Sequence, residues 1–459
     1  MVQRGLFFTP TQPVWMARAP GRLDLMGGNV DYTGGLVLQL PLREAIWAAV
    51  QPVSRATIRV HNPGAAQYGW ETALECPIAD LSSLPAIEAL CTQNPGAHWG
   101  RYVLGAFHLL RERYGAFTEQ GANLFLSSDL PPNRGVASSA ALEIATLKAA
   151  SAALSIRLEG VALAEAGQWV ENVVAHSACG IMDQAAIVLG RQDCLLPLLC
   201  QPCSPLPSIR LPAEVRVWGI DSMVSRSTSS LAYETARAAA FIGYKMICQW
   251  EGLSPVPEEM SGIPRWTEPR WKGYLSNLPP SEFRSRYEQR LPESIAGRDF
   301  LRHFGEHIDP FTSVQPDHSY PVRAAVRYAS EENLRIETVK VLLENGGYSE
   351  WENTLRLIGE LMLQSHLAYA ECGLGSSACD DLVALARRLG FFGAKMTGGG
   401  GGGVVAVLGL AHQEDRLREL VAIYAGQCGV RPNLFEGSSD GADASELSSL
   451  ALSTLAEAQ

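Results

Sequence analysis

The chain has 459 residues, of which 37 are basic and 48 acidic, and its net charge is −11. This charge argues against a nucleic-acid-binding protein, because a polyanion would meet a repulsive field. The 47% hydrophobic and 19% charged residues are typical of globular proteins and exclude general disorder. No apolar run reaches the roughly 18 residues of a membrane span, and the first residues lack the apolar stretch of a signal peptide. We therefore expect a cytoplasmic protein without a membrane or nucleic-acid partner, while a monomer and a homodimer both stay open.

The first half of the chain begins as a sheet and continues with helices. We predict strands at 36–40, 46–50 and 56–60, a helix over 99–114, a strand over 122–127 and helices over 138–154 and 163–174. Pro41 and Pro52 separate the early strands. Four prolines crowd residues 200–212, where neither a regular helix nor a central strand can continue, and this predicts a domain boundary there.

The second half repeats the change from strand to helix. We predict a strand at 215–220, a helix over 232–250, amphipathic helices over 332–343, 354–370 and 380–389, and a strand at 404–408. Residues 252–321 look like a proline-rich insertion of loops and short helices, and residues 437–459 like a polar tail with a short, frayed helix. Strands and helices in both halves, without strict alternation, predict an α+β protein with domains at 1–205 and 206–459.

A glycine-rich loop at residues 19–35 carries Arg22, Asp24, Asn29 and Asp31. Glycines let the backbone bend sharply while short polar side chains stay available, as a site for sugar hydroxyls requires. A plain turn with solvated carboxylates is the alternative interpretation.

A second segment, residues 130–143, places a turn and two serines, Ser138 and Ser139, directly before a strong helix. Unpaired N–H groups at a helix N-terminus form an anion site, so we expect phosphate binding there. An ordinary serine N-cap is the alternative interpretation.

A third segment consists of the glycines 398–403, which precede a strand instead of opening a helix, so the pattern is not a dinucleotide fingerprint. The sequence also contains no G-x-x-x-x-G-K-(S/T), which excludes a P-loop. Two other strings could suggest zinc: Cys200 and Cys203 form one isolated C-x-x-C, and His303 to His307 match H-x-x-E-H around Gly305. We interpret neither as a metal site, because the cysteines lack further ligands and a glycine interrupts the second string.

In this order the three glycine-bearing segments resemble the signatures of the GHMP kinase superfamily, the second one as P-x-x-x-G-(L/V)-x-S-S-A. The string C-G-I-M-D-Q at 179–184 resembles the galactokinase-like branch, and residues 21–28, 218–222 and 372–376 resemble its members that act on L-arabinose. The resemblance runs from about residue 17 to 408. It implies the GHMP kinase fold, an α+β fold of two domains with mixed sheets, packed helices and the active site in the cleft between them. It also implies ATP as co-substrate and Mg²⁺ as cofactor.

The resemblance further implies roles for individual residues. Asp183 would be the base at the anomeric hydroxyl and Arg22 the cation beside it and the γ-phosphate, since phosphoryl transfer requires positioning and charge stabilisation. Ser139 and Glu171 would bind Mg²⁺. The implied ATP contacts are Asn133, Arg134, Gly135, Val136, Ala137, Ser138, Ser139, Ala140, Gly399 and Gly400. Asn133 stands where the family usually has glycine, and asparagine tolerates a left-handed backbone better than most residues.

The expected sugar contacts are Asp24, Gly28, Asn29, Asp31, Gly180 and Tyr233. Galactokinases carry Glu and His at the positions of Gly28 and Asn29, where they reach the C6 hydroxyl of a hexose. Losing these partners removes the reason to prefer a hexose. We therefore expect a sugar 1-kinase that converts L-arabinose to β-L-arabinose 1-phosphate. Galactose, galacturonate and a non-catalytic sugar sensor on the same fold stay open as alternatives.

Overall fold

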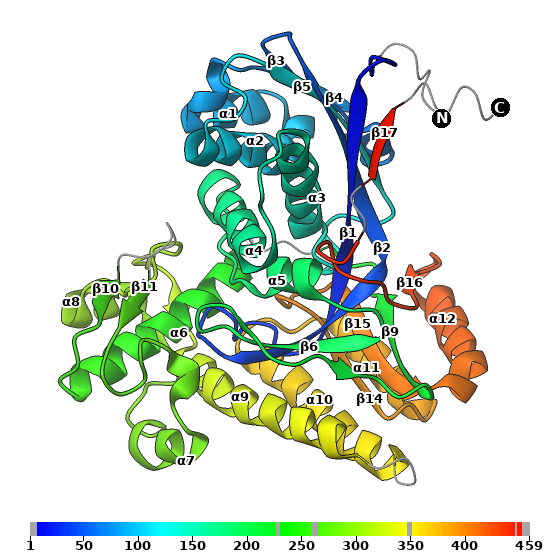
Figure 1. Cartoon of the computed structure of the whole chain (residues 1–459). Coiled ribbons are helices and arrows are strands. Elements are labelled where there is room, and N and C mark those ends of the chain that lie inside the picture. The colour runs from blue at the N-terminus through cyan, green and yellow to red at the C-terminus, as the bar shows by residue number, and fades with distance from the viewer. Residues whose placement is uncertain (1–6, 226–229, 259–264, 347–350, 446–447, 452–459) are drawn as a thin grey trace.

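The computed structural model describes residues 7–225, 230–258, 265–346, 351–445 and 448–451 (Figure 1). Its larger sheet has the order β17-β1-β2-β5-β3-β4, and β6 pairs with β2 and with the short strands β7 and β8. The bounds are β1 (Pro13–Met26), β2 (Leu36–Val53), β3 (Thr57–His61), β4 (Ala73–Pro77), β5 (Gly121–Ser128), β6 (Cys194–Leu199), β7 (Ser204–Pro205), β8 (Ile209–Arg210) and β17 (Ser448–Ala451).

A smaller sheet has the order β14-β15-β9-β16, and two further strand pairs, β10-β11 and β12-β13, lie in the predicted insertion. The bounds are β9 (Val215–Asp221), β10 (Val256–Glu258), β11 (Arg265–Thr267), β12 (Ile295–Ala296), β13 (Ser319–Tyr320), β14 (Gly393–Met396), β15 (Val404–Leu410) and β16 (Leu434–Phe435).

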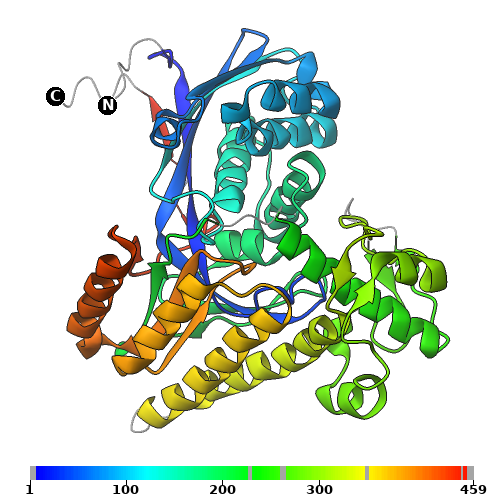
Figure 2. The same cartoon turned by 180° about the vertical axis from the view of Figure 1, so that it is seen from behind.

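Helices cover both sheets. They are α1 (Leu84–Thr92), α2 (Gly100–Tyr114), α3 (Ser138–Ala153), α4 (Gly160–Trp169), α5 (Met182–Leu189), α6 (Leu231–Trp250), α7 (Pro280–Glu282), α8 (Gly297–Phe304), α9 (Val322–Asn345), α10 (Trp351–Glu371), α11 (Ser377–Arg388) and α12 (Glu414–Cys428). Figures 1 and 2 show α1 to α4 on one face of the larger sheet, where α3 packs on β1 and β2. The helices α10 and α11 pack on the smaller sheet. Among the described residues, no helix combines the length and apolar character that crossing a lipid bilayer requires.

The strand β2 differs from its prediction because it is one continuous strand of 18 residues. Pro41 lies opposite Arg22, beside a register shift in the β1–β2 pairing. An irregularity of this kind tolerates the missing N–H of proline, so separate strands at 36–40 and 46–50 were the wrong prediction. The length of β2 lets its first part pair with β6 and its second part with β5.

The C-terminal tail also differs from its prediction. A strand, β17, pairs antiparallel with β1 at Pro13–Met16 and brings the tail back to the sheet in which the chain begins. The prediction of a helix is therefore wrong at Ser448–Ala451, while 446–447 and 452–459 lie outside the described residues. The division into domains at 1–205 and 206–459 stays a prediction.

The hydrophobic core has two parts. The larger cluster runs through both sheets and their helices, from Ala17 near the N-terminus to Ala442. The smaller cluster joins α6 and α9 to the predicted insertion through Ile242, Phe283 and Val326. The insertion is therefore anchored by its own core against two long helices, although its residues 259–264 lie outside the described part of the chain.

Candidate active site

A buried ion pair lies at the centre of the site. Nε and Nη2 of Arg22 donate hydrogen bonds of 2.8 and 2.7 Å to Oδ1 of Asp183. Arg22 comes from β1 and is fully buried, whereas the side chain of Asp183, in the first turn of α5, keeps 14% of its surface exposed. Burial tends to lower the pKa of Arg22, but Asp183 and Asp24 outweigh it and raise the pKa. The pair therefore presents one partly open carboxylate beside a permanent cation.

The segment 130–143, which we call the phosphate loop, is tied to the same arginine. Nη1 of Arg22 donates to the carbonyl oxygen of Gly135 at 2.6 Å, and its backbone N–H donates to Val136 at 3.1 Å. Thr397 donates to the Gly135 carbonyl from the opposite side of the site, at 3.4 Å. One arginine thus positions both the carboxylate and the phosphate loop.

The phosphate loop reaches α3 with its first N–H groups uncapped. Ala137, the residue before the helix, has a left-handed backbone with φ 58°, and no side chain caps the helix. The alternative of an ordinary serine N-cap is therefore wrong, and the uncapped N–H groups suit an anion. Asn133 also adopts a left-handed φ, of 58°, as expected for the residue that replaces a glycine.

Ser139 and Glu171 lie together, since the serine hydroxyl donates to Oε1 of Glu171 at 2.9 Å. Glu171 stands in a π-helical turn, Val170–Val174, and also accepts a hydrogen bond from Gln184 at 2.6 Å. Burial, together with Asp183, raises the pKa of Glu171 to about 7. A hydroxyl and a carboxylate oxygen beside an anion site fit Mg²⁺, which takes few protein ligands when phosphates and water supply the rest. No group of three or more His, Cys, Asp or Glu residues suited to a metal occurs in the described part of the chain.

A pocket beside the phosphate loop, here the phosphate-loop pocket, is lined by Asn133, Gly135, Ala137, Ser138, Ser139 and Asp183. Its far wall is aromatic and consists of Tyr68, Trp70, His98, Trp99 and Tyr102. The Trp70 ring lies 4.5 Å from the His98 ring and 5.1 Å from the Tyr68 ring. No sequence motif marks this wall, and its only signal in the sequence is the density of aromatic residues around positions 68–70 and 98–102.

A second pocket, here the Asp31 pocket, shares no lining residue with the phosphate-loop pocket. It is lined by Asp31, Gly180, Arg237, Asp309 and Phe311, among others. A Cβ on Gly180 would lie 2.0 Å from Oδ2 of Asp31, so only glycine leaves room for this carboxylate. Burial raises the pKa of Asp31 to about 6, and the nearby Asp183 adds to this shift. One carboxylate of each pocket, Asp31 and Asp183, is thus close enough to the other for the charge of Asp183 to act on Asp31.

Tyr233 is the one predicted sugar contact that comes from α6. It is buried near Asp31, and its ring lies 6.1 Å from the ring of Tyr32. Burial and Asp31 raise the pKa of Tyr233 well above its usual value, so the phenol stays neutral and can donate a hydrogen bond. Neither Arg237 nor Asp309 was foreseen from the sequence, because no local motif marks them.

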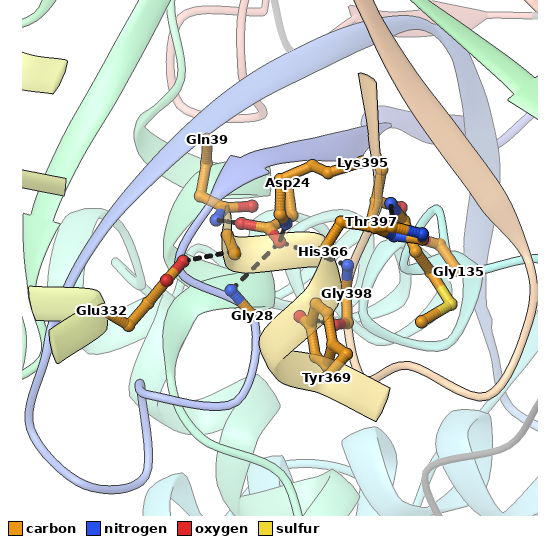
Figure 3. Close-up of polar contacts among 12 residues, drawn as sticks. Asp24, Gly28, Gln39, Gly135, Glu332, His366, Tyr369, Lys395, Thr397 and Gly398 are labelled. Carbon is orange, nitrogen blue, oxygen red and sulfur yellow. Dashed lines mark hydrogen bonds and ion pairs between the residues drawn. The ribbon is translucent and has the colours of Figure 1, made fainter. Parts of the chain in front are cut away.

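Asp24 takes a different place from the one expected of a sugar ligand (Figure 3). Its carboxylate is fully buried and accepts hydrogen bonds from the backbone N–H groups of Gly28 and Gly398 and from the side chains of Gln39 and Lys395. A carboxylate with four internal donors joins loops that are far apart in the sequence. The structure thus gives Asp24 a positioning role.

Gly28 does not enlarge a sugar pocket. A Cβ at this position would lie 2.0 Å from the hydroxyl of Tyr369 and 2.3 Å from the carbonyl oxygen of Gly398. Tyr328 covers the other side and donates to the Gly28 carbonyl at 2.6 Å. The sequence leaves open whether Gly28 enlarges the pocket or is filled by a neighbour, and in the structure two tyrosines fill the space.

Asn29, the neighbour of Gly28, is buried without an internal partner for its amide. It has a left-handed φ of 63° and is only 3% exposed, and neither polar atom of its amide has a hydrogen-bond partner among the described residues. An unpaired buried amide is costly, and a bound ligand could supply its missing hydrogen bonds. The role of Asn29 as a sugar contact stays a prediction.

Several predicted ATP contacts lie elsewhere. Gly400 packs on Leu374, and neither Gly399 nor Gly400 lines the phosphate-loop pocket. Val136, Ala140 and Arg134 do not line this pocket either, and Arg134 lies 3.5 Å from Asp221 in the smaller sheet. The roles of these five residues as ATP contacts stay predictions. The third glycine segment thus supports the site through Thr397 and Gly398, since their contacts reach Gly135 and Asp24.

Two further predictions concern the position of the site between the domains and the H-x-x-E-H string at 303–307. The phosphate-loop pocket is lined only by residues of the predicted first domain, whereas the Asp31 pocket takes residues from both predicted domains. The helix α8 ends at Phe304, and Gly305 has φ 71°, so His303 and His307 do not share a helix. This supports the rejection of a zinc helix.

Three family signatures match the chain. They are the GHMP kinases N terminal domain at residues 101–191, the galactokinase galactose-binding signature at 6–52 and the GHMP kinases C terminal domain at 340–425. The first covers the phosphate loop and the second covers the loop of Arg22.

Relatives agree with these signatures. The L-arabinokinase of Arabidopsis thaliana is 34% identical over 95% of this chain, although the chain spans only 47% of that protein. A galactokinase of Roseiflexus sp. (strain RS-1) is 26% identical over 86% of this chain and 83% of its own length.

The fold is also that of a solved relative. The structure of Lactococcus lactis galactokinase complexed with galactose matches with a TM-score of 0.70 over 93% of this chain and 94% of that one, at 19% identity. The resemblance seen in the motifs is thus confirmed for fold and family: the chain belongs to the GHMP kinase family, as a galactokinase-like member.

Proposed function

We propose that this chain is an ATP-dependent sugar 1-kinase that converts L-arabinose to β-L-arabinose 1-phosphate. The observation that carries the proposal is the Arg22–Asp183 pair. Asp183 lines the pocket at the free N-terminus of α3, and its charge acts on Asp31, which lines a second pocket with other buried polar groups. Phosphoryl transfer needs an acceptor base and a cation at the point where two substrates meet.

In this proposal Asp183 takes the proton of the anomeric hydroxyl. The sugar oxygen forms a bond to the γ-phosphorus, the bond to the β-phosphate oxygen breaks, and ADP leaves with that electron pair. Both hydrogen bonds from Arg22 fall on Oδ1, so Oδ2 is the oxygen that receives the proton. Arg22 offsets the negative charge that the triphosphate brings near Asp183.

The nucleotide would occupy the phosphate-loop pocket, with its phosphates at the N-terminus of α3 and its base against the aromatic wall of Tyr68 and Trp70. Ser139 and Glu171 would hold Mg²⁺, which supplies charge neutralisation on the phosphates when bound.

The charges of the Asp31 pocket favour a neutral sugar. Three carboxylates, Asp31, Glu165 and Asp309, line it with two guanidinium groups, Arg237 and Arg265. Arg237 pairs with Asp309 and Arg265 with Glu165, which leaves the charge of Asp31. The carboxylate of galacturonate would meet a net negative pocket, which speaks against the uronic acid. Galactose stays the second candidate, supported by the match to galactokinases.

The test is ADP release with Mg-ATP and L-arabinose, D-galactose or D-galacturonate, for the wild type and Asp183→Asn. We expect strong turnover of L-arabinose and a fall in kcat of at least about 100-fold in the variant, because a general base is lost. Unchanged turnover by Asp183→Asn would contradict the assigned base. Sugar binding without turnover on any sugar would instead favour the sensor alternative. A cytoplasmic location, a monomeric or homodimeric state and the absence of nucleic-acid partners stay predictions from the sequence.

A further inference from the structure

Arg237 is held rigidly at the wall of the Asp31 pocket. It is only 3% exposed on α6, and its Nε and Nη2 each donate a hydrogen bond of 2.8 Å to the two oxygens of Asp309. The guanidinium carbon lies 5.0 Å from the centre of the Tyr32 ring and 5.5 Å from that of Phe311. A planar group with a bidentate partner and aromatic rings around it has one orientation.

The third nitrogen of this guanidinium, Nη1, takes no part in the pairing with Asp309. Nη1 of Arg237 is buried and has no hydrogen-bond partner among the described residues. A buried charged donor that stays unsatisfied is costly, so its retention calls for an acceptor that the protein itself does not supply. Because Arg237 lines the Asp31 pocket, a molecule bound in this pocket is the nearest source of such an acceptor.

The partner of Arg237 comes from the predicted insertion at 252–321. Asp309 and Phe311 line the pocket from this segment, as do Arg265, Trp266 and Tyr274. The pKa of Asp309 is lowered, because Arg237 outweighs the effect of burial, so the carboxylate stays ionised. The insertion therefore builds one wall of the pocket and fixes the guanidinium in it.

We propose that Nη1 of Arg237 donates a hydrogen bond to a hydroxyl of the sugar other than the anomeric one. The acceptor is a neutral hydroxyl, because Asp309 already neutralises the guanidinium. The anomeric hydroxyl belongs to Asp183, which lines the other pocket. Arg237 is thus a specificity-determining residue and Asp309 a positioning residue, and this rests on the proposed function.

The main test replaces both members of the pair, as Arg237→Met with Asp309→Leu. Removing both charges leaves no buried charge unpaired, so the protein should stay folded. We expect the calorimetric Kd for L-arabinose to rise about 10- to 100-fold, as the loss of a hydrogen bond from a charged donor predicts, while the KM for ATP stays unchanged. Arg237→Lys, which keeps the charge but lacks the fork, should show a similar rise and replaces the double variant if that one does not fold.

A set of monodeoxy L-arabinose analogues distinguishes a contact from a general structural role. The wild type should bind one analogue about 10- to 100-fold more weakly than the parent sugar, and the double variant should bind that analogue and the parent equally. The same ratio in both proteins for every analogue would overturn the inference.

Arg323→Met is the matched control. Arg323 donates to the carbonyl oxygen of Leu291 at 2.9 and 2.7 Å and so ties the insertion to α9, but it does not line the Asp31 pocket. An equal rise in Kd for Arg323→Met would show that loosening the insertion suffices, and would overturn the inference. Binding is measured directly and does not depend on turnover. A wild type that binds L-arabinose without turnover therefore contradicts the proposed function, but the binding comparison still tests the contact from Arg237. A wild type that binds no sugar overturns both.

Discussion

Gly28 gives the sharpest test of how the site is built. The change Gly28→Ala puts a Cβ 2.0 Å from the Tyr369 hydroxyl, 2.3 Å from the Gly398 carbonyl oxygen and 2.9 Å from Oδ2 of Asp24. All three distances are far below van der Waals contact, and all three partners belong to one buried hydrogen-bond network. The hydroxyl of Tyr369 donates to Gly398 at 2.6 Å, so moving it away from the new methyl group breaks this bond.

The expected loss combines two terms. Overpacking a tight core costs about 1–3 kcal/mol, and a buried hydrogen bond left unmade costs about 1–3 kcal/mol more. We therefore expect Gly28→Ala to lower the free energy of unfolding by about 2–6 kcal/mol. Urea denaturation of the ligand-free protein measures this, with the slope m compared between variants to confirm that the transition stays two-state.

A double-mutant cycle with Tyr369→Phe identifies the cause. Removing the hydroxyl removes the shortest contact, so the double variant should lose about 1–2 kcal/mol less than the sum of the single variants. Gly426→Ala is the control, because a Cβ there meets nothing within 4 Å, and alanine should slightly stabilise α12. The reasoning is refuted if Gly28→Ala unfolds at the same urea concentration as the wild type. It is also refuted if Gly28→Glu folds normally and prefers galactose.

Two further predictions concern the pockets. Asp31 has a pKa of about 6 in the folded protein against an ordinary 3.8, so its contribution to stability is present at low pH and is lost as the pH rises through about 6. The ligand-free wild type should therefore lose stability relative to Asp31→Asn mainly between about pH 4 and pH 6, and parallel Tm curves for the two proteins would contradict the raised pKa. Asn133→Gly replaces a residue with φ 58°, and because glycine adopts this conformation without steric cost we expect a gain of up to about 1 kcal/mol. Its KM for ATP should change by less than about threefold, because the backbone of the loop is retained; a large rise measured by ADP release would instead show that the amide contacts the nucleotide.

Local sequence predicted the elements whose patterns depend on neighbours in the chain. The helix predicted at 138–154 is α3, Ser138–Ala153, because alanine and leucine favour a helix and the preceding turn leaves its N-terminus free. The strand β2 was predicted less well, since the effect of Pro41 depends on the partner strand and on a shift in pairing that no local pattern encodes. The tail strand β17 was missed for the same reason, because its partner β1 lies at the other end of the chain.

The sequence by itself determined the family and predicted the chemistry of the site, through the motifs around Arg22, Ser139 and Asp183. These motifs are short, and the backbone geometry that they need, a tight turn or a free helix N-terminus, is set by a few adjacent residues. The tertiary structure alone decided which predicted residues face a ligand. Asp24 and Gly28 face inward because Lys395 arrives from the strand β14 and Tyr369 from α10. The Asp31 pocket takes Arg237 from a helix and Asp309 from an insertion. Contacts of this kind arise between segments hundreds of residues apart, so only the packing of the whole chain creates them.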